Sequence, residues 1–327
     1  MGTEKHITSI GGQAIIEGVM MHGPHQSAMA VRKADGEIVC KIDENRSKKR
    51  NKILKLPIIR GCVNFIDSMI IGMKALMASA EYIDVEDDAE SQSKFDKWLE
   101  NKFGDKIKDI VIYVAIVLAI IMSVGLFILL PTAITQGIQF LFEKLKLGDF
   151  AQTGAFVSTC EGIIKMIIFL TYMVLVSQMK DIKRVFEYHG AEHKTISCYE
   201  SGDELTVENV KNHTRFHPRC GTGFLLIVMI ISIIIYTTLP TFDQYGGFLR
   251  LLFRMGSRIL LLPVVAGISY EIIKLAGKSN NRLVKALIMP GLWLQRLTTK
   301  EPDSSQIEVA IESIKAVIPK NENDDKW

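Results

Sequence analysis

The sequence has few cysteines, and they lack the spacing that organises a disulfide-rich domain or a zinc finger. Five of the 327 residues are cysteine, and no two of them form a CxxC pair. Irregular spacing of this kind argues against a disulfide framework. We therefore expect the thiols to be free or to act as metal ligands, as cysteines on a cytoplasmic face often do.

The chain also lacks a strong excess of either charge. Its 39 lysine and arginine residues nearly balance 36 aspartate and glutamate residues, which leaves a formal net charge of +3. Charge alone thus gives no reason to expect nucleic acid as a partner. The first residues show no basic segment followed by an apolar core, so we expect no cleavable signal peptide.

Long apolar runs are the most prominent feature of the sequence. A helix needs about 20 apolar residues to cross a bilayer, and four runs meet or approach that length: 110–130, 156–179, 221–239 and 259–273. Glu161 and Lys165 interrupt the second run, but they lie four residues apart and can pair on one helical face. The sequence predicts a mainly α polytopic membrane protein with about four transmembrane helices.

The distribution of lysine and arginine predicts how these helices are oriented. Residues 1–109 carry 17 of them, residues 180–220 carry seven and the tail after 273 carries nine, whereas residues 131–155 carry two. Cytoplasmic segments are enriched in lysine and arginine, and an even number of crossings puts both ends on one side. We expect a multi-pass protein with both termini and the 180–220 loop in the cytoplasm.

The segment before the first run predicts two further parts. Residues 1–53 mix β-branched residues with glycines and contain the hairpin signal Asp35-Gly36, which is typical of a small β-rich unit. Residues 54–109 would form a helix over 57–80 and then a polar connector. In that helix the charged residues lie seven apart on one face, which indicates an amphipathic helix on the membrane or on the bundle. A fifth crossing by this helix is the alternative.

Two remaining segments complete the expected organisation. The basic stretch 44–55 links the β-rich unit to the amphipathic helix, and it is either a solvated linker or a contact to anionic lipid headgroups. Residues 110–275 would hold the four transmembrane helices with the cytoplasmic loop 180–220. Residues 276–327 would form a cytoplasmic helical tail, with helices around 280–287 and 306–318.

The richest stretch for chemistry is YHGAEHK at residues 188–194. His189 and His193 lie four residues apart, so on a helix they project from one face and can share a metal ion. Glu192 lies close enough to act as a general base or as a further ligand. This HxxEH order occurs in some zinc hydrolases. Because Gly190 weakens helix propensity, we expect a helix end nearby.

A second motif, HPRC, immediately precedes the third run. His217 and Cys220 are three residues apart, and the short loop holds them near the same membrane surface as the first motif. We expect the His193 and His217 rings to lie about 4–8 Å apart if one metal ion joins them. Four ligands would make a closed structural site, and three ligands with Glu192 would make an open one. The alternative is a hydrogen-bonded polar network without metal.

A third motif, GGQAIIEGVMMHGP, begins at Gly11. Its paired glycines indicate close backbone approaches, and its polar side chains Gln13, Glu17 and His22 can face a site. The motif has no GK[ST] and is not a P-loop. The alternative is a glycine-broken strand of the β-rich unit.

Together these motifs resemble the YqhQ family of bacterial membrane proteins. The resemblance rests on GGQAIIEGVMMHGP, DGEIV, YHGAEHK, HPRCGT, PGLWLQRLTTKEP and QIEVAI, which follow one another in the expected order along nearly the whole chain. The family has no established function and is sometimes labelled a predicted metal-dependent enzyme, located in the bacterial cell membrane. The resemblance implies these motif positions: Glu17, His189, Glu192, His193, Glu200, His217 and Cys220.

Three functions are compatible with these observations. The first is a membrane-embedded metal-dependent hydrolase at the cytoplasmic surface, with Glu192 and Glu17 as catalytic candidates and zinc as the expected divalent metal. The second is a non-enzymatic factor that binds or stabilises other membrane proteins, and the third is a transporter. Membrane lipid is the expected partner, and self-association is an open alternative. An open three-ligand site would favour the hydrolase.

Overall fold

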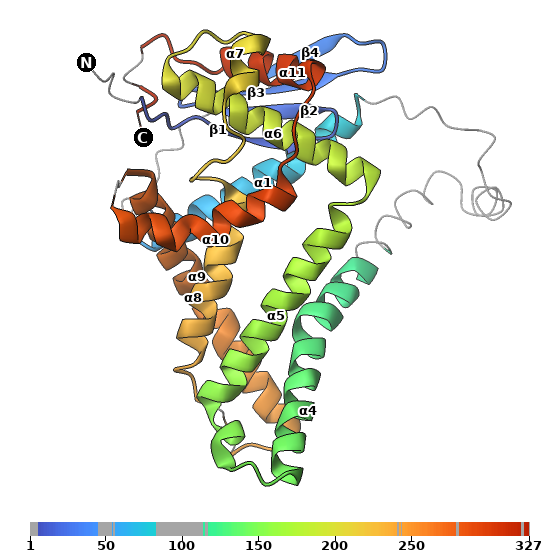
Figure 1. Cartoon of the computed structure of the whole chain (residues 1–327), viewed down its shortest axis with the longest axis vertical. Helices are drawn as coiled ribbons and strands as arrows, with labels where there is room; N and C mark the ends of the chain where they lie inside the picture. Colours follow the sequence, from blue (N-terminus) through green and yellow to red (C-terminus); the bar gives the residue numbers. More distant parts are fainter. Residues whose placement is uncertain are drawn as a thin grey trace, which may run out of the picture. The chain divides into compact units, whose positions relative to one another are not determined.

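The computed structural model describes residues 6–44, 54, 56–82, 114, 117–240, 242, 244–278, 281–321 and 324–326 (Figure 1). The chain divides into two compact units. The larger comprises residues 1–83, 172–235 and 242–327, and the smaller comprises 84–171 and 236–241. The predicted basic link and polar connector lie almost wholly outside the described residues.

A four-stranded antiparallel sheet opens the larger unit. Its strands are β1 (Gly11–Ile15), β2 (Gly18–His22), β3 (Gln26–Arg32) and β4 (Ile38–Glu44), and they pair in chain order. The β3–β4 hairpin turns at the predicted Asp35-Gly36 pair, where Gly36 has a φ of 89° that glycine adopts without strain. The small N-terminal β-rich part predicted from the sequence is therefore confirmed.

Helices from distant parts of the chain cover both faces of this sheet. One face packs against α6 (Lys180–Ser201), α7 (Val207–Asn212) and α11 (Ser304–Lys315) in a single apolar core. The other face packs against α1 (Ile59–Ala80). Because both faces are covered, the middle of β3 is buried throughout, and the sheet shares its core with the C-terminal helix instead of forming one alone.

Three apolar helices form a second core in the larger unit. They are α8 (Gly221–Tyr236), α9 (Gly247–Lys278) and α10 (Arg282–Thr298). Gly223 of α8 and Gly291 of α10 let the two backbones approach closely, since a Cβ on Gly291 would lie 2.9 Å from the Gly223 Cα. The predicted start of the fourth transmembrane helix at residue 259 is wrong, because α9 begins at Gly247. The helix includes Arg250, Arg254 and Arg258, which precede the apolar run.

The smaller unit contains the helix Val117–Lys144, whose second half is α4 (Leu130–Lys144), and most of α5 (Gly154–Val176). The predicted end of the first run at Pro131 is wrong. A π-helical turn, η2 (Gly125–Leu129), precedes the proline and places it in the first turn of α4, where its missing N–H costs little. A short 3-10 helix, η3 (Asp149–Gln152), joins α4 to α5, and the centroids of the Phe142 ring of α4 and the Phe156 ring of α5 lie 5.7 Å apart.

Within the described residues, four helices are long and apolar enough to cross a membrane: Ile59–Ala80, Val117–Lys144, Gly154–Val176 and Gly247–Ala276. The predicted class, a mainly α membrane protein with about four such helices, is confirmed. The set of four helices differs from the predicted set. α1 is long and apolar enough to be included, whereas α8, with 16 residues, is too short.

Candidate metal centre

The HxxEH motif lies in the middle of a continuous helix. α6 runs to Ser201 and ends at Gly202, which adopts the left-handed conformation usual at helix ends. The expected helix end near Gly190 is therefore wrong. Gly190 lies where α6 meets the chain after α10, and a Cβ there would collide with the Lys300 carbonyl oxygen. The glycine is needed for this close approach, and packing of α6 offsets its low helix propensity.

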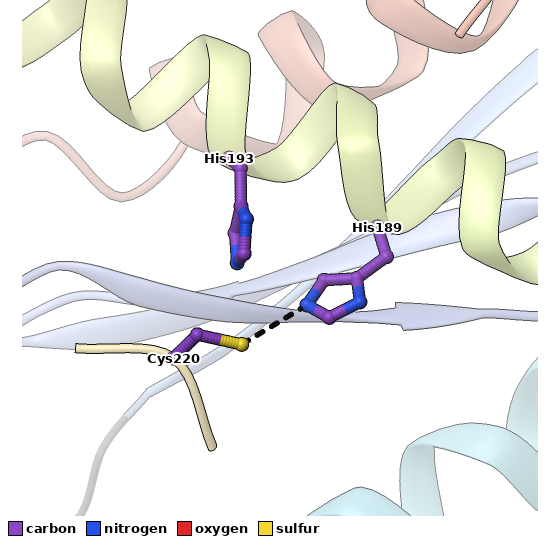
Figure 2. A group of neighbouring side chains, drawn as sticks. All are labelled: His189, His193 and Cys220. Atoms are coloured by element: carbon purple, nitrogen blue, oxygen red, sulfur yellow. Dashed lines mark hydrogen bonds between the residues drawn. The ribbon is translucent and has the colours of Figure 1, made fainter. Parts of the chain in front are cut away.

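Three donor groups meet beside α6 (Figure 2). His189, His193 and Cys220 each offer one donor atom, and these atoms all lie within 4.8 Å of one another. The Cys220 Sγ is 3.3 Å from the His189 Nε2. Nitrogen and sulfur ligands of a tetrahedral zinc ion, at bond lengths of about 2.0 and 2.3 Å, lie roughly 3.5 Å apart. The group can therefore hold a metal ion without large movement.

Backbone carbonyls orient both imidazole rings. The Nδ1 of His189 is 2.8 Å from the Thr298 carbonyl oxygen, and the Nδ1 of His193 is 2.6 Å from the Arg215 carbonyl oxygen. A carbonyl oxygen only accepts hydrogen bonds, so each Nδ1 carries the proton and donates it. Ligating histidines in metalloproteins are held in this way, with the other ring nitrogen turned toward the metal.

Electrostatics favour a thiolate at Cys220. Burial disfavours this charge, yet the neighbouring His189 and His193 hold the pKa of the thiol well below its ordinary value. Burial likewise disfavours a charged His189, but Cys220 and Glu192 outweigh it and raise the pKa of His189 to about 9. Loss of the His189 proton leaves a thiolate and two neutral imidazoles, which is the donor set of a Cys-His₂ zinc site.

Glu192 lies against these donors and is 4% exposed. Its Oε2 is 3.8 Å from the His189 Nε2 and 3.6 Å from the His193 Nε2. The opposite wall is the backbone of β1, because a Cβ on Gly12 would lie 2.9 Å from the Glu192 Cγ. The GGQ motif thus contributes to the site through a missing side chain.

The structure also brings the HPRC motif to this cluster. The ring centroids of His193 and His217 are 5.6 Å apart, within the expected range. His217 has other partners, however. Its Nε2 accepts a hydrogen bond from Arg219 at 3.1 Å and lies 3.8 Å from Glu200, which Arg219 also binds. His217 is therefore beside the three-donor group and not part of it, which leaves that group open.

Residues from α10 hold the cluster, and sequence reasoning missed them. The buried Gln295 side chain accepts from the His217 backbone N–H at 2.8 Å and donates to the His217 carbonyl at 2.7 Å. Thr298 supplies the carbonyl that orients His189. The signal available in the sequence was the PGLWLQRLTTKEP motif, in which a glutamine and two threonines follow the apolar residues PGLWL.

Comparison with known proteins identifies the family of this chain. The family described as "Protein of unknown function (DUF1385)" matches residues 56–320. The chain belongs to this family. The "Uncharacterized protein YqhQ" of Bacillus subtilis (strain 168) is 37% identical to it over 320 residues, which cover 97% of this chain and 95% of that protein. No solved structure matches. The resemblance seen in the motifs is thereby confirmed, and both descriptions leave the activity open.

The polar side chains of the GGQAIIEGVMMHGP motif do not contact the three-donor group through any hydrogen bond found among the described residues; they bind elsewhere. Glu17 lies in the β1–β2 turn, where Arg184 binds it and the Tyr188 hydroxyl donates to it at 3.2 Å. Gln13 donates to the Gly72 carbonyl of α1 at 3.4 Å. Side chains alternate along a strand, so Gln13 faces away from Glu192 when Gly12 faces toward it. His22 contacts Ser27, and burial lowers its pKa.

Proposed function

We propose that this protein is a membrane-embedded, metal-dependent hydrolase that acts at the cytoplasmic face of the bacterial cell membrane. One observation carries the proposal: two oriented histidines and a buried cysteine sulfur converge, while a buried carboxylate lies beside them. A site with three protein ligands keeps a position open for chemistry, whereas four protein ligands close it. The substrate class is a membrane-protein segment or a lipid headgroup.

The donor set favours zinc. Imidazole and thiolate are ligands that zinc prefers, whereas magnesium and calcium prefer oxygen. When bound, the ion would polarise a carbonyl or phosphoryl oxygen as a Lewis acid. His189, His193 and Cys220 would hold it, and the Thr298 and Arg215 carbonyls would keep the two rings in position.

Glu192 would move the proton. Its carboxylate would accept a proton from an attacking water molecule and return it to the leaving group as the scissile bond breaks. The low exposure of the cluster would exclude other water molecules and strengthen the local charges. Arg219 and Glu200 would fix His217 at the edge of the site through the contacts described above.

A cytoplasmic location is supported by connectivity together with charge. The N-terminal sheet, α6, α7 and α11 share one core, so both chain ends and the 180–220 segment lie on one side of any membrane. The same segments are rich in lysine and arginine, which favours the cytoplasmic side. A substrate in or on the membrane would reach the site from this surface.

A non-enzymatic role is the second candidate, because the cluster also joins three parts of the fold. α6, the HPRC turn and the end of α10 meet at it. A metal in such a place could act as a structural staple that keeps a docking factor for other membrane proteins folded.

Glu192→Gln and His193→Ala distinguish the two functions. For a hydrolase, Glu192→Gln should keep protein level and bound zinc but fail to complement a deletion strain, whereas His193→Ala should lose zinc and function together. Glu204→Gln, which changes an exposed acid in the same segment, is the matched control. Zinc content and protein level are measured on the same purified samples. Full complementation by Glu192→Gln at normal protein level would exclude the catalytic role.

A further inference from the structure

We infer that α1 is a docking surface for the lipid bilayer and lies in the membrane interface without crossing it. The inference is independent of what the metal centre does. One face of α1 carries an uninterrupted apolar row: Ile66, Met69, Ile70, Met73, Leu76 and Met77. Met73 and Met77 are 60% and 66% exposed. The spacing of three and four residues puts the whole row on a single stripe of the helix.

The opposite face of α1 is attached to the protein along its length. Near the C-terminal end, the Ser79 hydroxyl accepts a hydrogen bond from the Ile16 backbone N–H, and Ala75 is buried against the sheet. Near the N-terminal end, Arg60 donates to Glu271 of α9 at 2.8 Å. The helix therefore spans from the underside of the sheet to the C-terminal part of α9 (Figure 1). One end of α1 is therefore fixed to the sheet and the other to the C-terminal part of a candidate membrane-crossing helix, α9.

Chain connectivity argues against a complete crossing by α1. The sheet before α1 and α6 after α5 share one core, so the chain between them crosses an even number of times. Three helices in this stretch are long and apolar enough to cross, and α1 is the least apolar of them. If the other two cross, the count is already even, and the connector at 81–109 is too charged to add another crossing. A crossing by α1 would put α6 on the opposite side from the sheet against which it packs.

Basic residues at and before the start of α1 fit an anionic lipid surface, whereas the acidic stretch 81–90 follows the helix and would stay in solvent. Lys74 lies at the edge of the apolar stripe, and Arg60 is near the start of the helix. The sequence immediately before α1 adds six lysine or arginine residues between positions 46 and 55. An amphipathic helix preceded by a basic segment inserts its apolar face about 5–10 Å into the boundary between headgroups and acyl chains.

Tryptophan depth measurements test this inference on the full-length protein. Ile66, Met73 and Met77 are changed singly to tryptophan after the native Trp98, Trp293 and Trp327 are replaced by phenylalanine. The protein is reconstituted in phosphatidylcholine–phosphatidylglycerol vesicles containing lipids brominated near the headgroup or near the end of the acyl chain. All three positions should lose most fluorescence with the shallow bromines. Ile167→Trp in the middle of α5 is the control and should lose most with the deep bromines.

The depth profile along the helix decides the outcome. A helix in the interface gives the same shallow depth at all three positions. If quenching at Met73 matched that at Ile167, α1 would cross the membrane and the inference would be wrong. If neither lipid quenched any of the three, a protein surface would cover the row, and the inference would equally fail. Circular dichroism spectra and thermal unfolding measured on the same samples show that each variant is folded.

Discussion

At the scale of single residues, the site depends on Gly12, because a Cβ atom at this position would leave too little space for Glu192. Gly12 has no side chain, and the space is filled by Glu192 and by Met21, whose Sδ would lie 2.8 Å from a Cβ at this position. The Glu192 carboxylate also contacts His189 and His193, whose rings are held by backbone carbonyls, so its side chain has little room to move away. The glycine is therefore part of the positioning of the carboxylate.

Gly12→Ala tests this role. The added methyl group should push Glu192 or the β2 backbone aside and lower stability by about 1–3 kcal/mol, as overpacking usually does. Gly11→Ala is a matched control on the same strand, since nothing lies within 4 Å of a Cβ there. Thermal unfolding and cellular complementation are measured for both. Equal effects of the two substitutions would contradict the close approach.

Sequence reasoning located the donors well and their supporting residues poorly. His189, His193 and Glu192 are grouped by helical spacing, and Cys220 was placed near them by the short loop between two apolar runs. Gln13 and Glu17 looked equally suitable, but strand alternation turns Gln13 toward α1, and Arg184 binds Glu17. The contribution of Thr298 depends on chain packing across more than a hundred residues, which no local pattern reveals.

At the scale of elements, two errors in the predicted helices lie at single residues. Pro131 and Gly190 are residues that usually end helices, yet a π-turn accommodates the first and a close packing contact requires the second. A local change of helix geometry explains Pro131, and tertiary packing overrides local propensity at Gly190. The hairpin at Asp35-Gly36 and the helix over 57–80 were predicted correctly because their patterns are local and strong.

α10 offers a test of how an element holds the site. Gln295→Leu removes both hydrogen bonds to the His217 backbone and leaves a buried N–H and a buried carbonyl unpaired, at about 1–3 kcal/mol each. We expect a lower unfolding temperature and a looser HPRC turn. Arg296→Gln, at the next and exposed position, should change stability by less than about 0.5 kcal/mol. A silent Gln295→Leu would show that α10 does not hold His217.

At the scale of the whole molecule, the proposed orientation makes a direct prediction. Cysteine introduced at Glu208 in α7 should be protected from a membrane-impermeant maleimide added to intact cells, because the proposed orientation puts α7 in the cytoplasm. Cysteine introduced at Leu147, between α4 and α5, should react. The parent chain with its native cysteines gives the baseline. The opposite labelling pattern would invert the proposed topology and put the metal centre outside the cell.

The core shared by the first strands and the last helix has a consequence for biogenesis. The sheet is synthesised before the membrane helices, but α11, which completes its core, follows all of them in the chain. The Thr298 carbonyl that orients His189 also comes late. One apolar face of the newly made sheet therefore stays exposed until the membrane helices have been inserted and α11 can pack against it. His189 gains its carbonyl partner only once α10 has been made, so the site is completed after the membrane helices that precede α10 in the chain.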